Sequence, residues 1–299
     1  MKQQIKSSLI LLLTATIWGV AFVAQSVGME YIGPFTFNAI RCVLGGLVLI
    51  PVILVLKKKK ETGAENQEKE DKKTLWAGGI ACGVILCIAS NLQQFGIMEA
   101  SVGKSGFFTA LYIVMIPVIG IFIGKRQGIK LWFCVALAVV GMYLLCMKDG
   151  SFTIERADIM LLLCALAFSF HILVVDYFSP KVDGVKMSCI QFFVCGVLSA
   201  VGMLFTETPD ISNIQAAWLP LLYAGLLSCG VGYTLQIVGQ KGINPVIASL
   251  IMSLESVISA LAGWVILGQV LSPKEILGCV LMFVAIIITQ IPIGNKKTD

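Results

Sequence analysis

The chain has 299 residues, of which 58% are hydrophobic and only 13% are charged, and its mean hydropathy is +0.92. Soluble domains carry roughly 25% charged residues, so a water-soluble fold of this composition would leave large apolar areas wet. The composition therefore indicates an integral membrane protein in contact with a lipid bilayer. The net charge of +5 comes mainly from lysines between the apolar segments, so no nucleic-acid partner is expected.

Ten apolar segments approach the roughly 20 residues that a helix needs to cross a bilayer. They lie near residues 8–26, 34–56, 75–95, 103–123, 131–147, 158–176, 187–205, 218–238, 245–266 and 275–292. Their residues do not alternate as barrel strands do, so each segment must pair its own backbone groups, as only a helix can. We therefore predict an all-α integral membrane protein with ten transmembrane helices. The first segment could also be read as a signal peptide, but the repeat described below favours a spanning helix.

The distribution of positive charge predicts the orientation, because cytoplasmic loops collect Lys and Arg. With the N-terminus inside, 17 of the 22 Lys and Arg residues fall on the inner side and 4 on the outer side, while Arg41 lies within a helix. Seven of the inner lysines lie in the loop 57–73. The sequence thus predicts a multi-pass protein of the cell (inner) membrane with both termini in the cytoplasm.

Metal and disulfide chemistry are not expected. The 10 cysteines are scattered through the apolar segments without a CxxC pair, and the chain has 1 histidine. Zinc sites and disulfide frameworks need closely spaced ligands or paired cysteines. We therefore expect no metal, no cofactor and small apolar roles for the cysteines.

The two halves of the chain resemble each other. Residues 11–56 align with 161–206 at an offset of 150, and residues 90–120 align with 233–263 at an offset of 143. The matches include Ala15 with Ala165, Ile40 with Ile190, Gly46 with Gly196, Gln93 with Gln236 and Gly120 with Gly263. Five helices per half would make the second half enter the membrane from the opposite side, which is the inverted repeat of secondary transporters. We predict one five-helix repeat over 1–147 and a second over 148–299.

Several motifs resemble the EamA branch of the drug/metabolite transporter superfamily. They are Ala15-Thr-Ile-Trp18-Gly19, Ile40-Arg41, the stretch 101–112, Gly124-Lys-Arg126, the stretch 244–255 and Leu267-Gly268-Gln269. The resemblance covers roughly residues 8–292. It implies ten helices, both termini inside, and export of small metabolites or amino acids by alternating access. Family members commonly have Glu-Pro where this chain has Glu255-Ser256, and Gly-Glu where it has Gly268-Gln269.

Ionisable residues at bilayer depth are functional candidates, because each costs about 2.5–3.5 kcal/mol to insert. Arg41 could bind a substrate carboxylate, or it could pair structurally with carbonyls or a buried acid. Glu255 could take and release a proton for coupled transport, or remain neutral and hydrogen-bonded. His171 could relay a proton, although a lone helical histidine is more often only hydrogen-bonded.

Further polar and aromatic residues could line a cavity. Lys104 lies on a polar helix face with Ser105, Thr109 and Tyr112, and Tyr112 aligns with Glu255 in the repeat. Gln93 and Gln236 would add amides that suit zwitterionic or neutral polar solutes. Trp18 and Trp264 could wall the cavity, or they could be membrane-interface residues.

The function predicted is secondary transport, with a small polar metabolite and protons as partners, and not enzymatic catalysis. One alternative is an intramembrane serine protease using Ser105, in a GxSG motif, with His171 as base, which requires the hydroxyl within about 3 Å of the imidazole. That alternative leaves the repeat unexplained. A channel is a further alternative. The GxxxG motifs of residues 79–83 and 120–124 leave a monomer or a homodimer open.

Overall fold

The structure is a computed structural model and describes residues 2–62, 71–100, 102–125, 127–146, 155–267 and 271–291. All regular structure in these ranges is helical. The elements are α1 (Lys2–Gly28), α2 (Pro34–Thr62), α3 (Lys72–Glu99), α4 (Val102–Ala110), α5 (Tyr112–Phe122), α6 (Ile129–Cys146), α7 (Arg156–Phe178), α8 (Gly184–Thr206), α9 (Ile211–Ala216), α10 (Trp218–Leu222), η1 (Tyr223–Tyr233), α11 (Thr234–Gln240), α12 (Pro245–Met252), α13 (Glu255–Leu267) and α14 (Pro273–Gln290). The predicted all-α class is confirmed.

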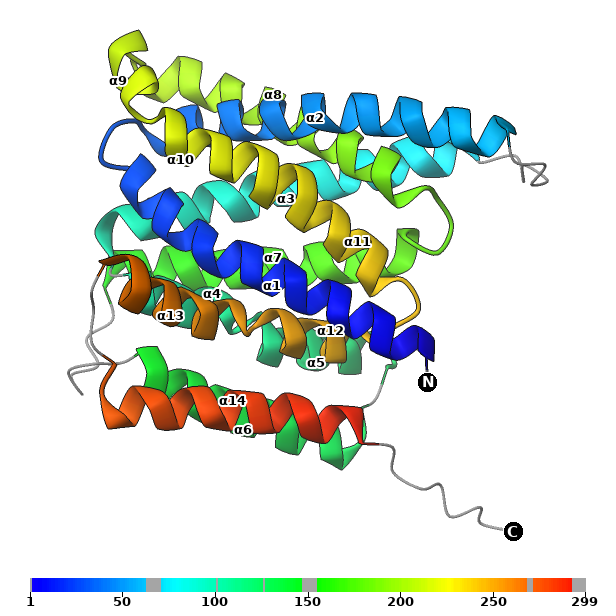
Figure 1. Cartoon of the computed structure of the whole chain (residues 1–299), viewed down its shortest axis with the longest axis vertical. Coiled ribbons are helices and arrows are strands. Elements are labelled where there is room, and N and C mark those ends of the chain that lie inside the picture. The colour runs from blue at the N-terminus through cyan, green and yellow to red at the C-terminus, as the bar shows by residue number, and fades with distance from the viewer. Residues whose placement is uncertain are drawn as a thin grey trace.

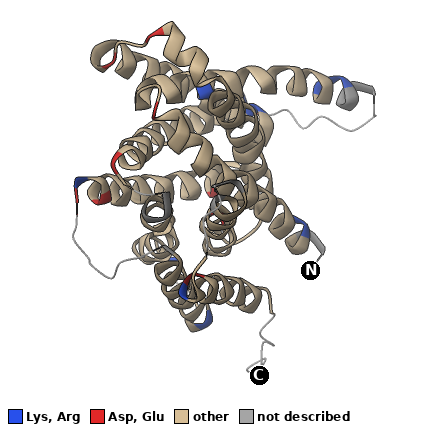
Figure 2. Ribbon diagram, turned by 60° about the vertical axis from the view of Figure 1, so that its left-hand side comes forward, with Lys and Arg blue, Asp and Glu red and all other residues tan. Residues whose placement is uncertain are grey.

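The lengths and exposed surfaces of the helices suit a lipid bilayer. Within the described ranges, nine spans are long and apolar enough to cross a membrane, and the shorter apolar helix Ile129–Leu145 lies where the fifth span was predicted. Ten spans therefore remain a prediction. Large apolar side chains lie on the outside, for example Val55 at 67% exposure and Phe205 at 85%. Figure 2 shows charged residues mostly near the ends of helices, which leaves long uncharged middles for the bilayer.

The long helices run side by side as a stack of roughly parallel rods (Figure 1). Helix α2 packs along α8 at one side of the stack, and α6 packs along α14 at the other. The two helices α6 and α14 approach so closely that a Cβ atom at Gly278 would lie 2.4 Å from the carbonyl oxygen of Gly141. Glycine at this position therefore permits the close packing. The start of α1 and the end of α14 lie at the same end of the stack.

The packing is paired in a way that follows the sequence repeat. Helix α3 packs against α7 and α8, and its repeat counterpart, the η1–α11 segment, packs against α1 and α2. One polar contact recurs as well. Asn38 Nδ2 donates to Asn91 Oδ1 at 2.9 Å, and the aligned residues Ser188 and Thr234 hydrogen-bond through their hydroxyls at 2.8 Å.

Three predicted spans are not single helices. The span predicted at 103–123 breaks at Leu111, between α4 and α5, and the span predicted at 245–266 breaks at Ser253 and Leu254, between α12 and α13. The span predicted at 218–238 consists of α10, the π-helix η1 and α11. Apolar composition alone does not reveal such breaks, because the residues on both sides are equally apolar. Short α9 was also not predicted.

The N-terminus of α2 is capped by a carboxylate from another helix. Glu207, the C-cap of α8, accepts from the backbone N–H groups of Phe35 (2.9 Å) and Thr36 (2.8 Å) and from the Thr36 hydroxyl (2.6 Å). These N–H groups have no partner inside their own helix, and a negative charge also suits the helix dipole.

Replacing Glu207 by alanine is therefore expected to lower the free energy of unfolding by about 2 kcal/mol. Denaturant unfolding in detergent micelles, monitored by circular dichroism, measures this loss. Glu30→Ala is the matched control, because it removes an exposed carboxylate near the same helix start. Equal stability of the two variants would contradict the capping role.

Candidate functional site

The two helix breaks are equivalent in the sequence repeat, and the residues that follow them, Tyr112 and Glu255, are hydrogen-bonded to each other. At one break, Leu111 N–H donates to the carbonyl of Phe108 at 3.2 Å, and at the other Leu254 N–H donates to Ile251 at 3.2 Å. The offset between them is the repeat offset of 143. The next residues are Tyr112 and Glu255, which begin α5 and α13. Broken helices near mid-membrane are typical of substrate sites in secondary transporters.

The breaks open onto a pocket whose empty space, including the open solvent at its mouth, amounts to about 450 Å³. Helices from both halves of the chain contribute its wall. The lining residues are Trp18, Phe22, Gln25, Arg41, Gln93, Thr109, Tyr112, Phe168, Ile172, Ser228, Tyr233, Gln236 and Glu255.

Glu255 supplies the carboxylate of the cavity and is 4% exposed. Its Oε1 accepts from the Tyr112 hydroxyl at 3.2 Å. No cation lies within salt-bridge distance of it among the described residues. Helix α1 comes close here, since a Cβ at Gly19 would lie 2.7 Å from the backbone oxygen of Glu255. Gly19 thus allows α1 to pack directly over the α12–α13 break.

Arg41 supplies the positive charge and is 2% exposed. Its Nη1 donates to Gln25 Oε1 at 2.8 Å, and the same oxygen accepts from Gln94 Nε2. Its guanidinium lies 5.6 Å from the centre of the Phe37 ring. Its Nε has no hydrogen-bond partner, and no described carboxylate lies within 4 Å. Gln25 therefore holds the guanidinium in place while leaving donor capacity unused.

Amide and aromatic groups complete the wall. The repeat partners Gln93 and Gln236 both line the cavity. The Trp18 ring contacts that of Tyr233 with ring centres 4.6 Å apart and planes tilted by 55°, and its Nε1 donates to the carbonyl of Ser228 at 3.4 Å. The site is thus partly apolar, with a few convergent polar groups.

The structure brings most of the sequence-predicted residues together. Trp18, Arg41, Gln93, Tyr112, Gln236 and Glu255 all line the cavity. Trp264 does not line it and is 52% exposed. The side chain of Lys104 lies outside the part of the chain whose side chains the structure describes.

His171 lies behind the wall rather than in it. Its Nε2 is 3.1 Å from Gln191 Oε1, an oxygen that can only accept, so Nε2 carries the hydrogen. Its ring meets that of Tyr233 edge to face at 6.0 Å. Its Nδ1 has no hydrogen-bond partner.

The protease dyad is not formed in this structure. Ser105 is fully buried, and its hydroxyl has no hydrogen-bond partner. His171 is engaged with Gln191, and its second ring nitrogen is unpaired. No hydrogen bond therefore joins the serine to the imidazole.

Sequence analysis missed three polar residues of the wall, Gln25, Ser228 and Tyr233, whereas Thr109 lies on the polar helix face it had singled out. Gln25 lies near the end of the first predicted span, 8–26, and α1 continues past it to Gly28. An amide within an apolar span was the signal that could have revealed it.

Comparison with known proteins identifies the family. The sequence pattern of the EamA-like transporter family matches residues 5–147 and again residues 155–291. The chain belongs to the EamA-like transporter family. It is a multi-pass membrane protein of this transporter family, and the resemblance stated from its motifs is confirmed.

Two curated relatives that match nearly the whole of this EamA-like chain are named as transporters. The chain is 27% identical over 282 residues to an "Uncharacterized transporter" of Archaeoglobus fulgidus, covering 94% of this chain and 84% of the relative. It is 24% identical to the "Uncharacterized transporter YwfM" of Bacillus subtilis, covering 97% and 96%. A known crystal structure of a protein at 17% identity superposes with a TM-score of 0.76, covering 95% of this chain and 96% of the other. That likeness shows a shared fold.

Proposed function

We propose that this EamA transporter is a proton-coupled exporter of amino acids or similar small polar metabolites that works by alternating access. The observation that carries the proposal is that one cavity is lined by both Arg41 and Glu255, which are buried and have no partner of opposite charge among the described residues. Buried charges are normally paired. A zwitterion could supply both missing partners, with its carboxylate on Arg41 and its ammonium on Glu255.

Proton coupling follows if Glu255 binds either a proton or the substrate ammonium group. Export would then exchange one for the other, because a single carboxylate cannot hold both. Tyr112 would orient the carboxylate in each state. His171 is the second candidate for proton transfer, since its Nδ1 is unpaired and its ring touches Tyr233 of the cavity wall.

Alternating access is supported by the paired packing of the two proposed repeats, 1–147 and 148–299. The equivalent breaks before Tyr112 and Glu255 and the equivalent hydrogen bonds at Asn38 and Ser188 fit an inverted repeat. We also place both termini in the cytoplasm. The start of α1 and the end of α14 share one end of the bundle, and the lysine bias favours that end as the inner one.

The test of this function is a thermal-shift screen of the purified transporter against amino acids, nucleosides and sugars. A ligand at 100 times its Kd stabilises the folded protein by about 2.7 kcal/mol. We expect stabilisation by zwitterionic amino acids and not by sugars. A response to sugars or nucleosides alone would contradict the proposed substrate class.

Gln25→Glu tests whether Arg41 is kept available for a ligand. The new carboxylate would replace an amide oxygen that lies 2.8 Å from Arg41 Nη1, so it should pair with the guanidinium internally. We expect substrate affinity to fall about tenfold or more while thermal stability is kept or rises. Calorimetric titration with the substrate found in the screen measures the affinity. Gln25→Asn is the uncharged control, and unchanged affinity in Gln25→Glu would make Arg41 a purely structural residue.

A further inference from the structure

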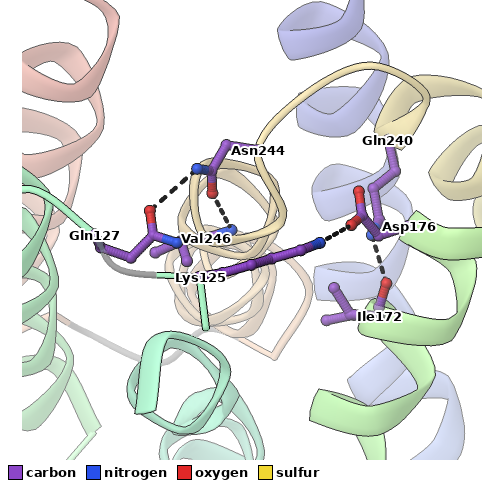
Figure 3. Close-up of polar contacts among 7 residues, drawn as sticks. All are labelled: Lys125, Gln127, Ile172, Asp176, Gln240, Asn244 and Val246. Atoms are coloured by element: carbon purple, nitrogen blue, oxygen red, sulfur yellow. Dashed lines mark hydrogen bonds and ion pairs between the residues drawn. The ribbon is translucent and has the colours of Figure 1, made fainter. Parts of the chain in front are cut away.

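Polar contacts gather at the end of the bundle that carries the turns 123–125 and 241–244, here called the Lys125 end (Figure 3). Lys125 Nζ lies 3.2 Å from Asp176 Oδ2. Asn244 Nδ2 donates to Gln127 Oε1 at 3.1 Å. Gln240 Nε2 donates to the carbonyl oxygen of Ile172 at 2.6 Å. These contacts join the α5–α6 turn, the end of α7 and the α11–α12 turn.

The residues in these contacts are fixed by the helix ends on which they lie. Gly124, with φ of +78°, ends α5, and Lys125 N–H then closes back onto the carbonyl of Gly120 at 2.8 Å. This is the pattern of a Schellman cap. Asn244 caps α12 by accepting from Val246 N–H at 2.9 Å. The contacts thus tie together the two half-helices α5 and α12, whose other ends lie at the breaks beside the cavity.

Two of these contacts adjoin the cavity wall. Ile172 lines the cavity wall, and its carbonyl is held by Gln240. Asp176 lies one helical turn further along α7, where it holds Lys125. Movement of α5 away from α7 at this end would therefore separate the ion pair before it exposed Ile172 and the cavity.

The residues that the repeat alignment places at the opposite end of the bundle are of other types. With the one-residue shift that puts Gly124 on Gly268, Gln269 corresponds to Lys125, while Ser26 corresponds to Asp176, Ser101 to Asn244 and Ile97 to Gln240. An ion pair cannot form between a serine and a glutamine. If the two halves exchange conformations, closure at the Lys125 end gains these contacts and closure at the other end does not.

We propose that Lys125–Asp176 and Gln127–Asn244 form a latch that favours the conformation closed at the Lys125 end, and that its one-sidedness makes the two access states unequal in population. This inference rests on alternating access as the proposed function. The relative populations of the two access conformations would then be set by residues outside the cavity. Opening at the Lys125 end would then cost the latch contacts in every transport cycle.

Hydrogen–deuterium exchange of the full-length transporter in lipid nanodiscs tests the latch without any substrate. Asp176→Asn should speed amide exchange in the segments 120–125 and 240–246 by up to about fivefold, the ratio expected for a partly exposed ion pair. Exchange at residues 93–99, at the opposite end, should slow. The charge swap Lys125→Asp with Asp176→Lys should restore the wild-type pattern, because it keeps an ion pair in the same place.

Lys241→Gln is the matched control, since it removes an exposed positive charge on the neighbouring turn and should leave exchange unchanged. Raised salt should speed exchange at the Lys125 end of the wild type and not of Asp176→Asn, because salt screens exposed charges. Wild-type exchange in Asp176→Asn, equal acceleration at both ends, or no rescue by the swap would each overturn the latch. Failure of substrate binding or gradient-driven flux would instead count against the proposed function, since exchange is measured without either.

Discussion

Replacing Glu255 by glutamine is expected to abolish accumulation driven by a pH gradient in proteoliposomes. One pH unit is worth about 1.4 kcal/mol per proton, so a one-for-one exchange can concentrate substrate about tenfold. Glutamine has nearly the same shape and can still accept from the Tyr112 hydroxyl, which lies 3.2 Å from Glu255 Oε1, but it carries no proton to exchange. The accumulation ratio in Glu255→Gln should therefore fall to about 1. Flux of labelled substrate under an imposed pH gradient measures this ratio.

Glu255→Asp and Tyr112→Phe serve as controls. The first keeps a carboxyl group at the break, and the second removes only the hydroxyl that orients it, so both should retain gradient-driven accumulation. Thermal unfolding of Glu255→Gln should match the wild type. The replacement breaks no ion pair, and the neutral amide keeps the shape of the side chain and its hydrogen bond with Tyr112. Full gradient-driven accumulation in Glu255→Gln would show that this residue is not the proton carrier and would leave His171 as the remaining candidate.

Replacing Arg41 by glutamine is expected to weaken binding of a carboxylate-bearing substrate by about 30-fold or more. Truncating one partner of a buried, hydrogen-bonded charge pair costs about 2–5 kcal/mol. Arg41 is buried, its Nε is unpaired, and its only hydrogen bond among the described contacts goes to the amide of Gln25. The glutamine can still donate to that amide, which limits damage to the fold. Calorimetric titration of the purified variant measures the affinity.

The control for Arg41 is a change in the ligand. The decarboxylated amine analogue of the substrate lacks the group that Arg41 would bind, so Arg41→Gln should leave its affinity nearly unchanged. The difference between the two ligands isolates the carboxylate–guanidinium contact. Equal losses for the acid and the amine would assign Arg41 to the structure of the protein rather than to substrate recognition.

Helix positions were predictable from the sequence, because apolar runs of bilayer length have few alternatives. The spans around α3, α7, α8 and α14 were placed within about four residues of their observed ends, whereas α1 begins six residues before its predicted start. The breaks at Leu111 and at Ser253–Leu254 were not predictable in this way, because a local change from α-helical to tighter hydrogen bonding alters no hydropathy. The sequence repeat nevertheless aligned Tyr112 with Glu255, and the structure joins these two residues by a hydrogen bond.

The candidate site was predictable where a polar residue stood out against an apolar span. Arg41, Glu255, Gln93 and Gln236 were predicted as site residues on this basis, and all four line the cavity. Trp264 was also predicted to line the cavity and does not, because the sequence around an aromatic residue in an apolar span does not show which way its side chain faces. Its exposed position fits the alternative of a membrane-facing tryptophan.

The latch residues were beyond sequence reasoning for a different physical reason. Lys125 follows the end of α5, Asp176 lies in the last turn of α7, and the two residues are 51 positions apart in the sequence. Charged residues are common at such helix ends. Only the fold brings α5, α7 and α12 to one end of the bundle and so turns two ordinary charges into a contact. The residues aligned with this pair, Ser26 and Gln269, carry no charges with which to form the same contact.

Counterflow tests the central claim of a carrier with one alternately exposed site most directly. Proteoliposomes would be loaded with unlabelled substrate and diluted into a trace of labelled substrate at equal pH on both sides. A carrier that alternates around the Arg41–Glu255 cavity is predicted to accumulate label inside, transiently and well above its equilibrium level, as unlabelled substrate leaves. Label that rises only to equilibrium, with a flux linear in concentration, would contradict this account and favour a channel.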